Sequence, residues 1–577
     1  MKRLLIYLSG YKRQTILAPL FKLSEASLEL IVPLIIAKII DNGILKGDYA
    51  YVGKMCALLV LLGAVGLAFS CTAQYFAAAA SVGFVAKVRD ALFGKVQTLS
   101  YSDLDKIGVS TLITRMTSDT SKVQNGLNLA LRLLLRSPFV VFGAMIMAFI
   151  VNPRPSVSFA VAIPILLVVV FGIMLITMPM YKRVQARTDD LMLSTRENLS
   201  GVRVVRAFCK EKDEIAKFSA KNTILTTVHK RVGMISSLMN PLTYVIINLA
   251  ILWLVYLGAV EVDVTAGEFT QGEVIALYNY MSQILIELIK LANLIISITK
   301  ALASADRIAD VLDFKPTENM GKLAEWRDND CTVEFRDASL TYSGAGESSL
   351  VGISFKAMRG ETVGIIGCTG SGKTSLVNMI PGFYKPTDGE VLINGVPVSE
   401  YSPAFLREKI GIVPQRAVLL GGTVRENMQL GAKEASDEEI YTALDIACAR
   451  EVVDSKGGLD ARVEESGRNF SGGQRQRLTI ARALVSKPEI LILDDSTSAL
   501  DYKTDLDVRT ALKTVQGKST VFIVSQRTSS IMHADRIIVL DDGQVVGIGT
   551  HGELLDSCEI YREIYSSQYR EEGKNNG

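Results

Sequence analysis

The sequence predicts an α-helical, membrane-embedded part followed by an α/β part. Six long apolar stretches precede residue 300, and all but one reach the about 17–25 residues that a helix needs to cross a bilayer. After residue 330, short β-branched runs alternate with helical patterns, which is typical of an α/β domain. A polar segment with proline and glycine, residues 314–321, separates the two parts. We therefore expect domains at 1–312 and 331–570, joined by a linker at 313–330.

Composition supports this division and excludes several classes of protein. Of the 577 residues, 49% are apolar, and the mean hydropathy is +0.28, which favours a membrane-embedded part. The formal net charge of +2 argues against nucleic-acid binding. Seven cysteines without a CxxC pair and three dispersed histidines indicate neither a disulfide framework nor a metal cluster.

The apolar stretches are expected to form six transmembrane helices with long cytoplasmic extensions. They cover residues 16–40, 55–80, 138–151, 157–178, 242–260 and 274–298. The third reaches spanning length only if residues 129–137 are added, which leaves five helices as an alternative. We prefer the even number because both termini then lie on one side of the membrane.

Charge predicts which side each loop faces. Residues 261–272 contain three acidic and no basic residues, whereas 87–136 and 181–231 are rich in lysine and arginine. The positive-inside rule therefore places the last two segments, both termini and the α/β part in the cytoplasm. The first ten residues combine a basic start with a short apolar run, which favours a short amphipathic helix at the membrane surface over a cleaved signal peptide.

A phosphate-binding loop is predicted near the start of the α/β part. Residues 364–374 read Gly-Ile-Ile-Gly-Cys-Thr-Gly-Ser-Gly-Lys-Thr, which matches G-x-x-x-x-G-K-[ST] between an apolar strand and a helix. Backbone N–H groups of such a loop close around phosphate oxygens at a helix N-terminus. The residues expected at the nucleotide are Gly367, Cys368, Thr369, Gly370, Ser371, Gly372, Lys373, Thr374 and Ser375.

Three side chains are expected to act directly on phosphate and Mg²⁺. Lys373 should reach the β- and γ-phosphates, and Thr374 should ligate Mg²⁺. Asp494 ends a buried apolar strand, and a carboxylate at that place beside a phosphate loop is the expected second Mg²⁺ anchor.

A third motif points to one family. Residues 470–474 read Phe-Ser-Gly-Gly-Gln, Gln415 follows Val-Pro, and Asp501 follows Ser-Ala-Leu. With these motifs the chain from about residue 331 onward resembles the ATP-binding cassette (ABC) ATPases. The segments 101–108 and 197–208 are similar to the cytoplasmic helices that couple the two halves of ABC exporters. The whole chain thus resembles an exporter half-transporter, and in particular the degenerate-site subunit of bacterial heterodimeric multidrug exporters.

The resemblance implies ATP and Mg²⁺ as cofactors and assigns further roles. Tyr342 would stack on adenine, although an ordinary strand aromatic is an alternative interpretation. Gln415 would sense Mg²⁺ and the membrane domain, and Asp501 would belong to the D-loop. In the family, two cassettes bind head to tail, so each ATP lies between the Walker residues of one chain and the signature of the other. The signature residues are Ser471, Gly472, Gly473 and Gln474.

Two residues depart from the pattern of ATP-hydrolysing relatives. Asp495 stands where they carry the catalytic glutamate, and Gln526 stands where they carry the switch histidine. The shorter aspartate withdraws its oxygens by about one C–C bond, and a displacement of about 1 Å can cost about 10²-fold in rate. Glutamine still donates a hydrogen bond, but it cannot carry charge or relay a proton.

The two departures beside a nearly intact signature predict a division of labour. This chain would hold ATP without fast turnover, and its signature would complete an active site on a partner half-transporter. The expected function is ATP-driven export of a hydrophobic or amphipathic compound, including drugs or lipids, across the plasma membrane, without nucleic acid. The alternatives are a slow homodimeric multidrug or lipid exporter and an ATP-gated membrane regulator or channel.

Ionisable residues inside the apolar stretches raise a question about the cargo. Glu29 or Glu287 could line a substrate path that favours cations, because charges at membrane depth usually face a cavity or a partner. Alternatively, Lys22 with Glu25 and Glu287 with Lys290 could pair locally, since each pair is three residues apart on one helical face. We favour local pairing for Lys22 and leave the role of Glu29 and Glu287 open.

Overall fold

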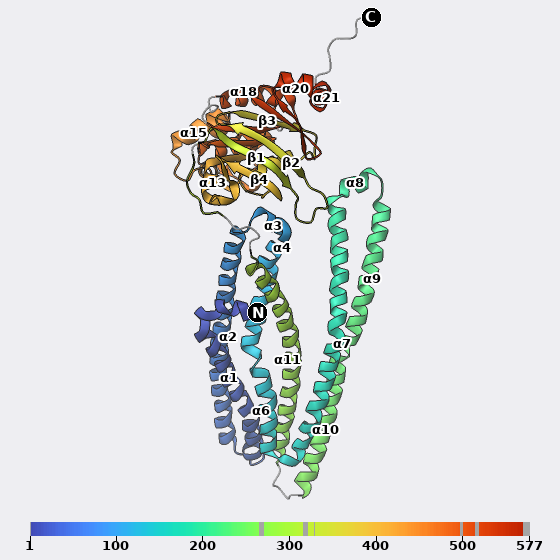
Figure 1. Cartoon of the computed structure of the whole chain (residues 1–577). Coiled ribbons are helices and arrows are strands. Elements are labelled where there is room, and N and C mark those ends of the chain that lie inside the picture. The colour runs from blue at the N-terminus through green and yellow to red at the C-terminus, as the bar shows by residue number, and fades with distance from the viewer. Residues whose placement is uncertain are drawn as a thin grey trace. The chain divides into compact units, whose positions relative to one another are not determined.

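The computed structural model describes residues 2–264, 270–315, 321–327, 329–496, 500–513 and 519–568. They fall into two compact units, each described by itself below. The first comprises Met1–Gln97 with Ser110–Phe314, and the second comprises Thr98–Val109 with the chain from Lys315 on. The first is helical and the second is α/β (Figure 1), which confirms the predicted fold class. The predicted linker lies partly outside the described residues, so its boundaries stay a prediction.

The helical unit is built from a few very long helices. Its elements are η1 (Lys2–Tyr11), α1 (Lys12–Lys38), η2 (Ile39–Ile44), α2 (Tyr49–Gln97), α4 (Val109–Thr114), η3 (Arg115–Asp119), α5 (Thr120–Leu133), α6 (Arg136–Val151), α7 (Pro153–Ser200), α8 (Val202–Ala207), α9 (Glu211–Ser237), α10 (Met239–Val264) and α11 (Gln271–Leu312). The 49 residues of α2 correspond to about 74 Å, against a hydrocarbon core of about 30 Å. The expected extensions beyond the membrane are therefore present.

The membrane-spanning helices agree with the sequence prediction in part. Among the described residues, five helical stretches are long and apolar enough to cross a bilayer, against the six preferred from the sequence. The predicted first span, α1, has 27 residues and is also long enough, but its middle carries Lys22, Glu25 and Glu29. The weak third stretch gains its length because α5 and α6 follow each other almost without interruption. The N-terminal segment, for which the sequence predicts a short amphipathic helix, is helical and of the 3₁₀ type, η1.

Small side chains let the membrane helices approach closely. A Cβ atom at Gly126 of α5 would lie 2.2 Å from Cβ of Ala301 on α11, so only glycine fits there. Nearer the other end, Ala144, Leu254 and Tyr280 are fully buried in the main apolar cluster of this unit. The close packing fixes α11 against α5 and α6.

The α/β unit contains two larger sheets. The six-stranded sheet has the order β12-β11-β3-β10-β9-β6, and the four-stranded antiparallel sheet has the order β2-β1-β4-β5. The strands are β1 (Cys331–Leu340), β2 (Leu350–Met358), β3 (Thr362–Gly367), β4 (Asp388–Ile393), β5 (Val396–Pro397), β6 (Ile410–Val413), β7 (Gly422–Thr423), β8 (Arg462–Val463), β9 (Ile490–Asp494), β10 (Thr520–Val524), β11 (Arg536–Asp541) and β12 (Gln544–Gly549).

Strands β3 and β9 are buried along their whole length, as expected of central parallel strands with both faces covered. The helices of this unit surround the sheets (Figure 1). They are α3 (Tyr101–Ile107), α12 (Lys373–Met379), η4 (Val398–Glu400), α13 (Pro403–Lys409), α14 (Val424–Gln429), α15 (Asp437–Ile446), α16 (Arg450–Ser455), η5 (Glu465–Gly467), α17 (Gly472–Val485), α18 (Tyr502–Leu512), α19 (Thr528–Ile531), α20 (His551–Ser557) and α21 (Glu559–Gln568).

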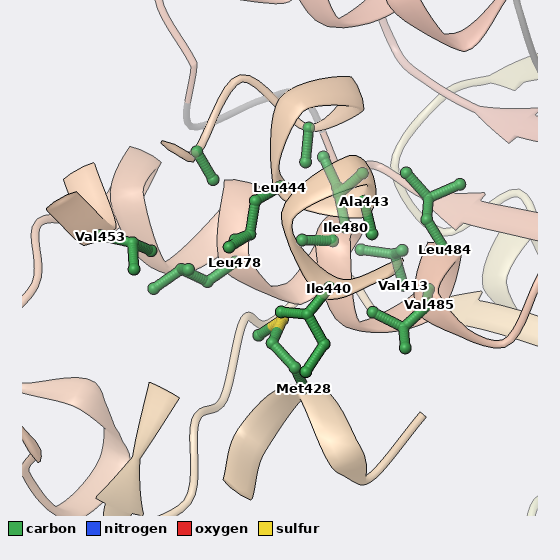
Figure 2. Packing of buried hydrophobic residues seen from close by; sticks show 14 of the residues in the cluster. Val413, Met428, Ile440, Ala443, Leu444, Val453, Leu478, Ile480, Leu484 and Val485 are labelled. Atoms are coloured by element: carbon green, nitrogen blue, oxygen red, sulfur yellow. The ribbon is translucent and has the colours of Figure 1, made fainter. Parts of the chain in front are cut away.

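An apolar cluster fixes α17, the helix that begins at the signature motif. Figure 2 shows Leu478, Ile480 and Leu484 of α17 packed beside Ile440 of α15 and Met428 of α14. All five side chains are buried. Because the body of α17 is held in this core, its exposed N-terminus has a defined direction.

Candidate nucleotide site

The site forms where three parallel strands end. Strand β10 lies between β3 and β9, and Val524 is level with Ile365 on one side and with Asp494 on the other. The carboxyl ends of parallel strands meet at one edge of a sheet, where α/β proteins bind ligands. A cavity of about 430 Å³ opens there. It is lined by Glu347, Ser348, Ser349, Thr369, Gly370, Gly372, Lys373, Thr374, Ser375, Gln415, Asp494, Asp495, Val524, Gln526, Asp542 and Gly543.

The phosphate loop requires glycine at its last turn. Gly372 has a φ of +92°, and a Cβ atom there would lie 2.8 Å from the carbonyl oxygen of Ser349. Lys373, only 8% exposed, donates from Nζ to the carbonyl oxygens of Gly367 at 2.8 Å and Cys368 at 2.6 Å. Burial lowers the pKa of this lysine. The ammonium is thus held by neutral acceptors in a cavity of nucleotide size, which fits a phosphate ligand.

The predicted Mg²⁺ anchors meet in the same cavity. Thr374 Oγ1 donates to Asp494 Oδ1 at 3.1 Å, and Gln415 lines the cavity beside them. Asp494 is 4% exposed, and burial raises the pKa of its carboxyl although the Thr374 hydrogen bond opposes this shift. A hydroxyl, a carboxylate and an amide are oxygen ligands of the kind that Mg²⁺ prefers, so these residues fit the metal.

Both residues that depart from the family pattern also line this cavity. Asp495 follows β9 with a φ of +44°, and its backbone N–H donates to the carbonyl oxygen of Val524 at 3.0 Å. Gln526 follows β10, two residues after Val524. The structure therefore places both residues in the lining of the cavity that also contains Lys373 and Asp494, where a catalytic carboxylate and a switch residue would act.

Tyr342 lies next to the phosphate loop and outside the lining of the main cavity. Its hydroxyl donates to Ser375 Oγ at 2.9 Å, and its ring meets that of Tyr384 edge to face, with centroids 5.0 Å apart. Tyr384 in turn donates to Asp105 Oδ2 of α3 at 2.7 Å. Burial and Asp105 raise the pKa of Tyr384. The adenine role of Tyr342 stays a prediction.

The short helix α3 belongs to the α/β unit because its side chains contact that unit. Tyr101 stacks on Phe383 with centroids 4.2 Å apart, beside the hydrogen bond from Tyr384 to Asp105. The sequence segment that resembles a coupling helix thus packs on the nucleotide-binding fold.

The signature residues lie apart from the residues that line the cavity. Ser471 caps α17: its side chain accepts from the N–H of Gln474, and Gln474 Oε1 accepts from the N–H of Ser471 at 2.9 Å. Ser471 and Gly472 are exposed, and the cavity lining given above includes none of residues 471–474. Asp501 similarly caps α18 by accepting from the N–H of Thr504.

Six lining residues were missed from the sequence: Glu347, Ser348, Ser349, Val524, Asp542 and Gly543. Gly543 lies at the cavity because β11 pairs with β3, with Leu540 opposite Gly367. The Val351 N–H also donates to the Gly543 carbonyl oxygen at 2.9 Å. The turn Asp-Asp-Gly between two strands predicts a hairpin, and only the strand order reveals that it borders the site.

In the helical unit, Glu29 and Glu287 share one arginine. Arg136 Nη2 lies 2.6 Å from Glu29 Oε2, and its Nη1 lies 2.5 Å from Glu287 Oε1. Ser137 Oγ and Lys290 Nζ each donate to Glu287 at 2.8 Å. The side chain of Glu287 is 4% exposed, whereas that of Glu29 is 40% exposed. The predicted local pair between Glu287 and Lys290 is confirmed.

The other predicted local pair is also present. Lys22 Nζ donates to Glu25 Oε2 at 2.5 Å and to Ser70 Oγ at 3.1 Å. These residues need no functional explanation beyond mutual charge compensation.

Comparisons with known proteins agree with this architecture. The family model described as ABC transporter transmembrane region matches residues 15–288, and the model described as ABC transporter matches residues 350–498. An uncharacterized ABC transporter ATP-binding protein of Bacillus subtilis (strain 168) is 35% identical over 575 residues, covering 99% of this chain and 99% of the relative. Another, from Mycobacterium tuberculosis (strain CDC 1551 / Oshkosh), is 35% identical over 569 residues, covering 97% of each chain.

A solved structure shares the whole fold. A bacterial Atm1-family ABC exporter with ATP bound has a TM-score of 0.80 to this chain at 22% identity, covering 98% of this chain and 99% of that one. Fold and site together define a membrane protein with an ATP-binding cassette. The chain belongs to the ABC transporter family and carries the transmembrane region and the ATPase domain on one polypeptide.

Proposed function

We propose that this chain is one subunit of a heterodimeric exporter that uses ATP to move a hydrophobic or amphipathic compound out of the cell. The observation that supports this most is the split within its ATP-binding domain. Lys373, Thr374 and Asp494 line a cavity together with the altered Asp495 and Gln526. The unaltered Ser471 end of the signature is exposed, as expected if it serves a nucleotide on another chain.

On its own Walker residues this chain would bind ATP firmly and hydrolyse it slowly. Lys373 and the loop N–H groups hold the phosphates, while Thr374, Asp494 and Gln415 hold Mg²⁺. Bound Mg²⁺ would neutralise charge on the phosphate oxygens. Asp495 is too short to orient water as a glutamate does, and the neutral side chain at position 526 donates a hydrogen bond without relaying a proton.

The transport cycle would follow from this asymmetry. ATP binding brings the two cassettes together and opens the membrane cavity outward, and hydrolysis at the site completed by Ser471 resets it. We propose the plasma membrane as the location, with both termini and the ATPase domain in the cytoplasm, because the segments 87–136 and 181–231 are rich in lysine and arginine.

The test compares the two composite sites of the assembled transporter. Asp495→Asn in this chain should leave ATPase activity nearly unchanged, whereas glutamine in place of the partner's catalytic glutamate should abolish it. ATP-dependent uptake of an amphipathic dye into inverted vesicles should follow the same pattern. Homodimers of this chain that hydrolyse ATP at a normal rate would contradict the proposal, and an ATP-gated conductance without accumulation would indicate a channel.

We further propose that Glu29 favours cationic cargo. Counted along α6 and α11, the ion cluster around Arg136 lies about 22–24 Å from the helix ends at Val151 and Gln271, which would be the inner half of a bilayer if these ends lie at its outer surface. Glu287 accepts from three donors, Arg136, Ser137 and Lys290. Glu29 keeps 40% of its side chain accessible. A carboxylate at that depth faces a partner or a water-filled cavity, and the exposed part of the Glu29 side chain would attract an amphipathic cation there.

Uptake of ethidium into inverted vesicles tests this role of Glu29. Glu29→Gln should lower uptake about tenfold, the change that about 1.4 kcal/mol of lost attraction produces, and should leave ATPase activity intact. Glu25→Gln is the matched control because its carboxylate pairs with Lys22 on the same helix. Equal uptake by both variants would remove Glu29 from the path.

A further inference from the structure

The segment that carries Gln526 is held by the last helix of the described chain. Gln568, at the end of α21, donates from Nε2 to the carbonyl oxygen of Gln526 at 2.7 Å. Its Oε1 accepts from the backbone N–H of Thr528 at 2.8 Å and from the Thr528 hydroxyl at 2.9 Å. A single amide thus binds both sides of the turn between β10 and α19.

The turn lacks a cap of its own. Helix α19 has only four residues, and its N-cap residue, Arg527, makes no side-chain cap hydrogen bond. The first N–H groups of a helix have no partner within the helix and need one outside it. Thr528 is fully buried, and the oxygen of Gln568 satisfies both of its donors. The C-terminal helix therefore provides the missing cap across 40 residues of sequence.

Packing keeps α21 in place to do this. Tyr561 of α21 and Ile531 of α19 are fully buried in one apolar cluster with Leu554 and Cys558. On another side, Arg509 of α18 donates to the carbonyl oxygen of Ser529. The four residues of α19 are thus clamped between the helix that follows Asp501 and the C-terminal helix.

We propose that Gln568 is a positioning residue for residues 525–528: it fixes the backbone that carries Gln526 and thereby sets how long ATP stays on this chain. The inference rests on the proposed function, in which this chain retains its nucleotide. Gln526 lines the cavity, and its carbonyl oxygen binds Gln568, so loss of the amide frees the backbone at the edge of the cavity. The Gln526 side chain would then lose its fixed place relative to a bound nucleotide.

Two variants at position 568 test the hydrogen bonds of the amide. Gln568→Glu keeps an acceptor for Thr528 but replaces the donor to Gln526 with an oxygen that repels its carbonyl. Gln568→Ala removes both contacts. Ser567→Ala is the matched control, since the Ser567 hydroxyl donates within α21, to the Ile564 carbonyl at 2.8 Å.

The first readout is release of nucleotide from this chain in the full-length transporter. After loading with 8-azido-ATP and rapid dilution into ATP, photo-crosslinking reports what remains, and gel electrophoresis separates this chain from a partner of different mass. Both Gln568 variants should release nucleotide about tenfold faster than Ser567→Ala. Release at the control rate by both variants would overturn the proposal. The proposal would also be overturned if all three variants released nucleotide faster and lost thermal stability to the same extent.

The second readout uses a background in which hydrolysis at this chain's own site is restored. Asp495→Glu with Gln526→His should raise ATPase activity when the partner's catalytic glutamate is changed to glutamine. Adding Gln568→Ala should then lower kcat and, because nucleotide leaves faster, also raise KM, whereas unchanged kcat and KM would contradict the positioning role. If the restored pair gives no hydrolysis at all, the degenerate-site assignment is wrong, and the release measurement still decides the role of Gln568.

Discussion

This chain has two buried groups of charged side chains, one around Arg136 and one around Lys373, and they differ in how the buried positive charge is balanced. In the helical unit, Arg136 is surrounded by two carboxylates and compensated within the protein. In the ATPase unit, the hydrogen-bond acceptors of Lys373 among the described residues are carbonyl and hydroxyl oxygens. Asp494 receives the hydroxyl of Thr374. In the first centre every charge has an opposite partner within the protein, with Glu29 still partly exposed. The second centre would be completed by a nucleotide and its cation.

The pKa shifts of the second centre express this difference. Burial lowers the pKa of Lys373 and raises that of Asp494, so each charged form is disfavoured without a ligand. A phosphate next to the ammonium and a cation next to the carboxylate would remove both penalties. A buried charge without an opposite charge close by therefore indicates a ligand site. A buried charge that the protein itself pairs indicates a structural role.

The largest effect is expected from breaking the complete centre. Arg136→Met leaves Glu29 and Glu287 without their shared cation, and removal of one partner of a buried ion pair costs about 3–5 kcal/mol. The variant should lose thermal stability strongly in detergent, measured by the temperature of aggregation. Lys290→Met is the control, because Lys290 is 43% exposed and the other donors to Glu287 remain. A loss as large in Lys290→Met would show that Arg136 is not the centre of the cluster.

The incomplete centre should respond in the opposite way. Lys373→Met removes a buried ammonium that the apo protein compensates poorly, so apo stability should stay the same or rise. Nucleotide affinity should fall about 10²-fold, since hydrogen bonds to charged groups contribute about 1.5–3 kcal/mol. Thermal shift with and without Mg-ATP measures both quantities in one experiment. A strong apo destabilisation would mean that Lys373 is structural like Arg136.

Acid should weaken nucleotide binding through Asp494. A carboxyl whose folded pKa is raised takes up a proton more readily in the folded apo chain than in the unfolded one, so folding of the apo chain gains as pH falls through that pKa. Mg²⁺ needs the carboxylate, so proton and metal compete, and affinity should fall by up to about tenfold per pH unit below the folded pKa. Titration of Mg-ATP at several pH values checks this, with Asp494→Asn expected to bind weakly without the pH dependence.

The sequence predicted the residues around Lys373 well and those around Arg136 poorly, for a physical reason. Lys373 and Asp494 each end or follow a parallel strand, and the edge where such strands end is fixed by the fold class. The pair Lys22–Glu25 followed from helical spacing alone. The link from Glu29 through Arg136 to Glu287 joins three helices, and helix packing decides which of many charges meet. The cap from Gln568 to Thr528 is equally non-local.

The smallest effect concerns Cys368, whose carbonyl oxygen accepts from Lys373. Its side chain is exposed in the apo chain, although it belongs to the loop that closes on phosphate. Alkylation of the thiol should hinder nucleotide binding, and Mg-ATP should slow labelling several-fold by restricting access to the loop. Mass spectrometry of Cys368 and of the equally exposed Cys209, with and without Mg-ATP, measures this difference. Protection of Cys368 alone would place the ligand at the incomplete centre, and equal labelling of both thiols would mean that the loop stays open when ATP is bound.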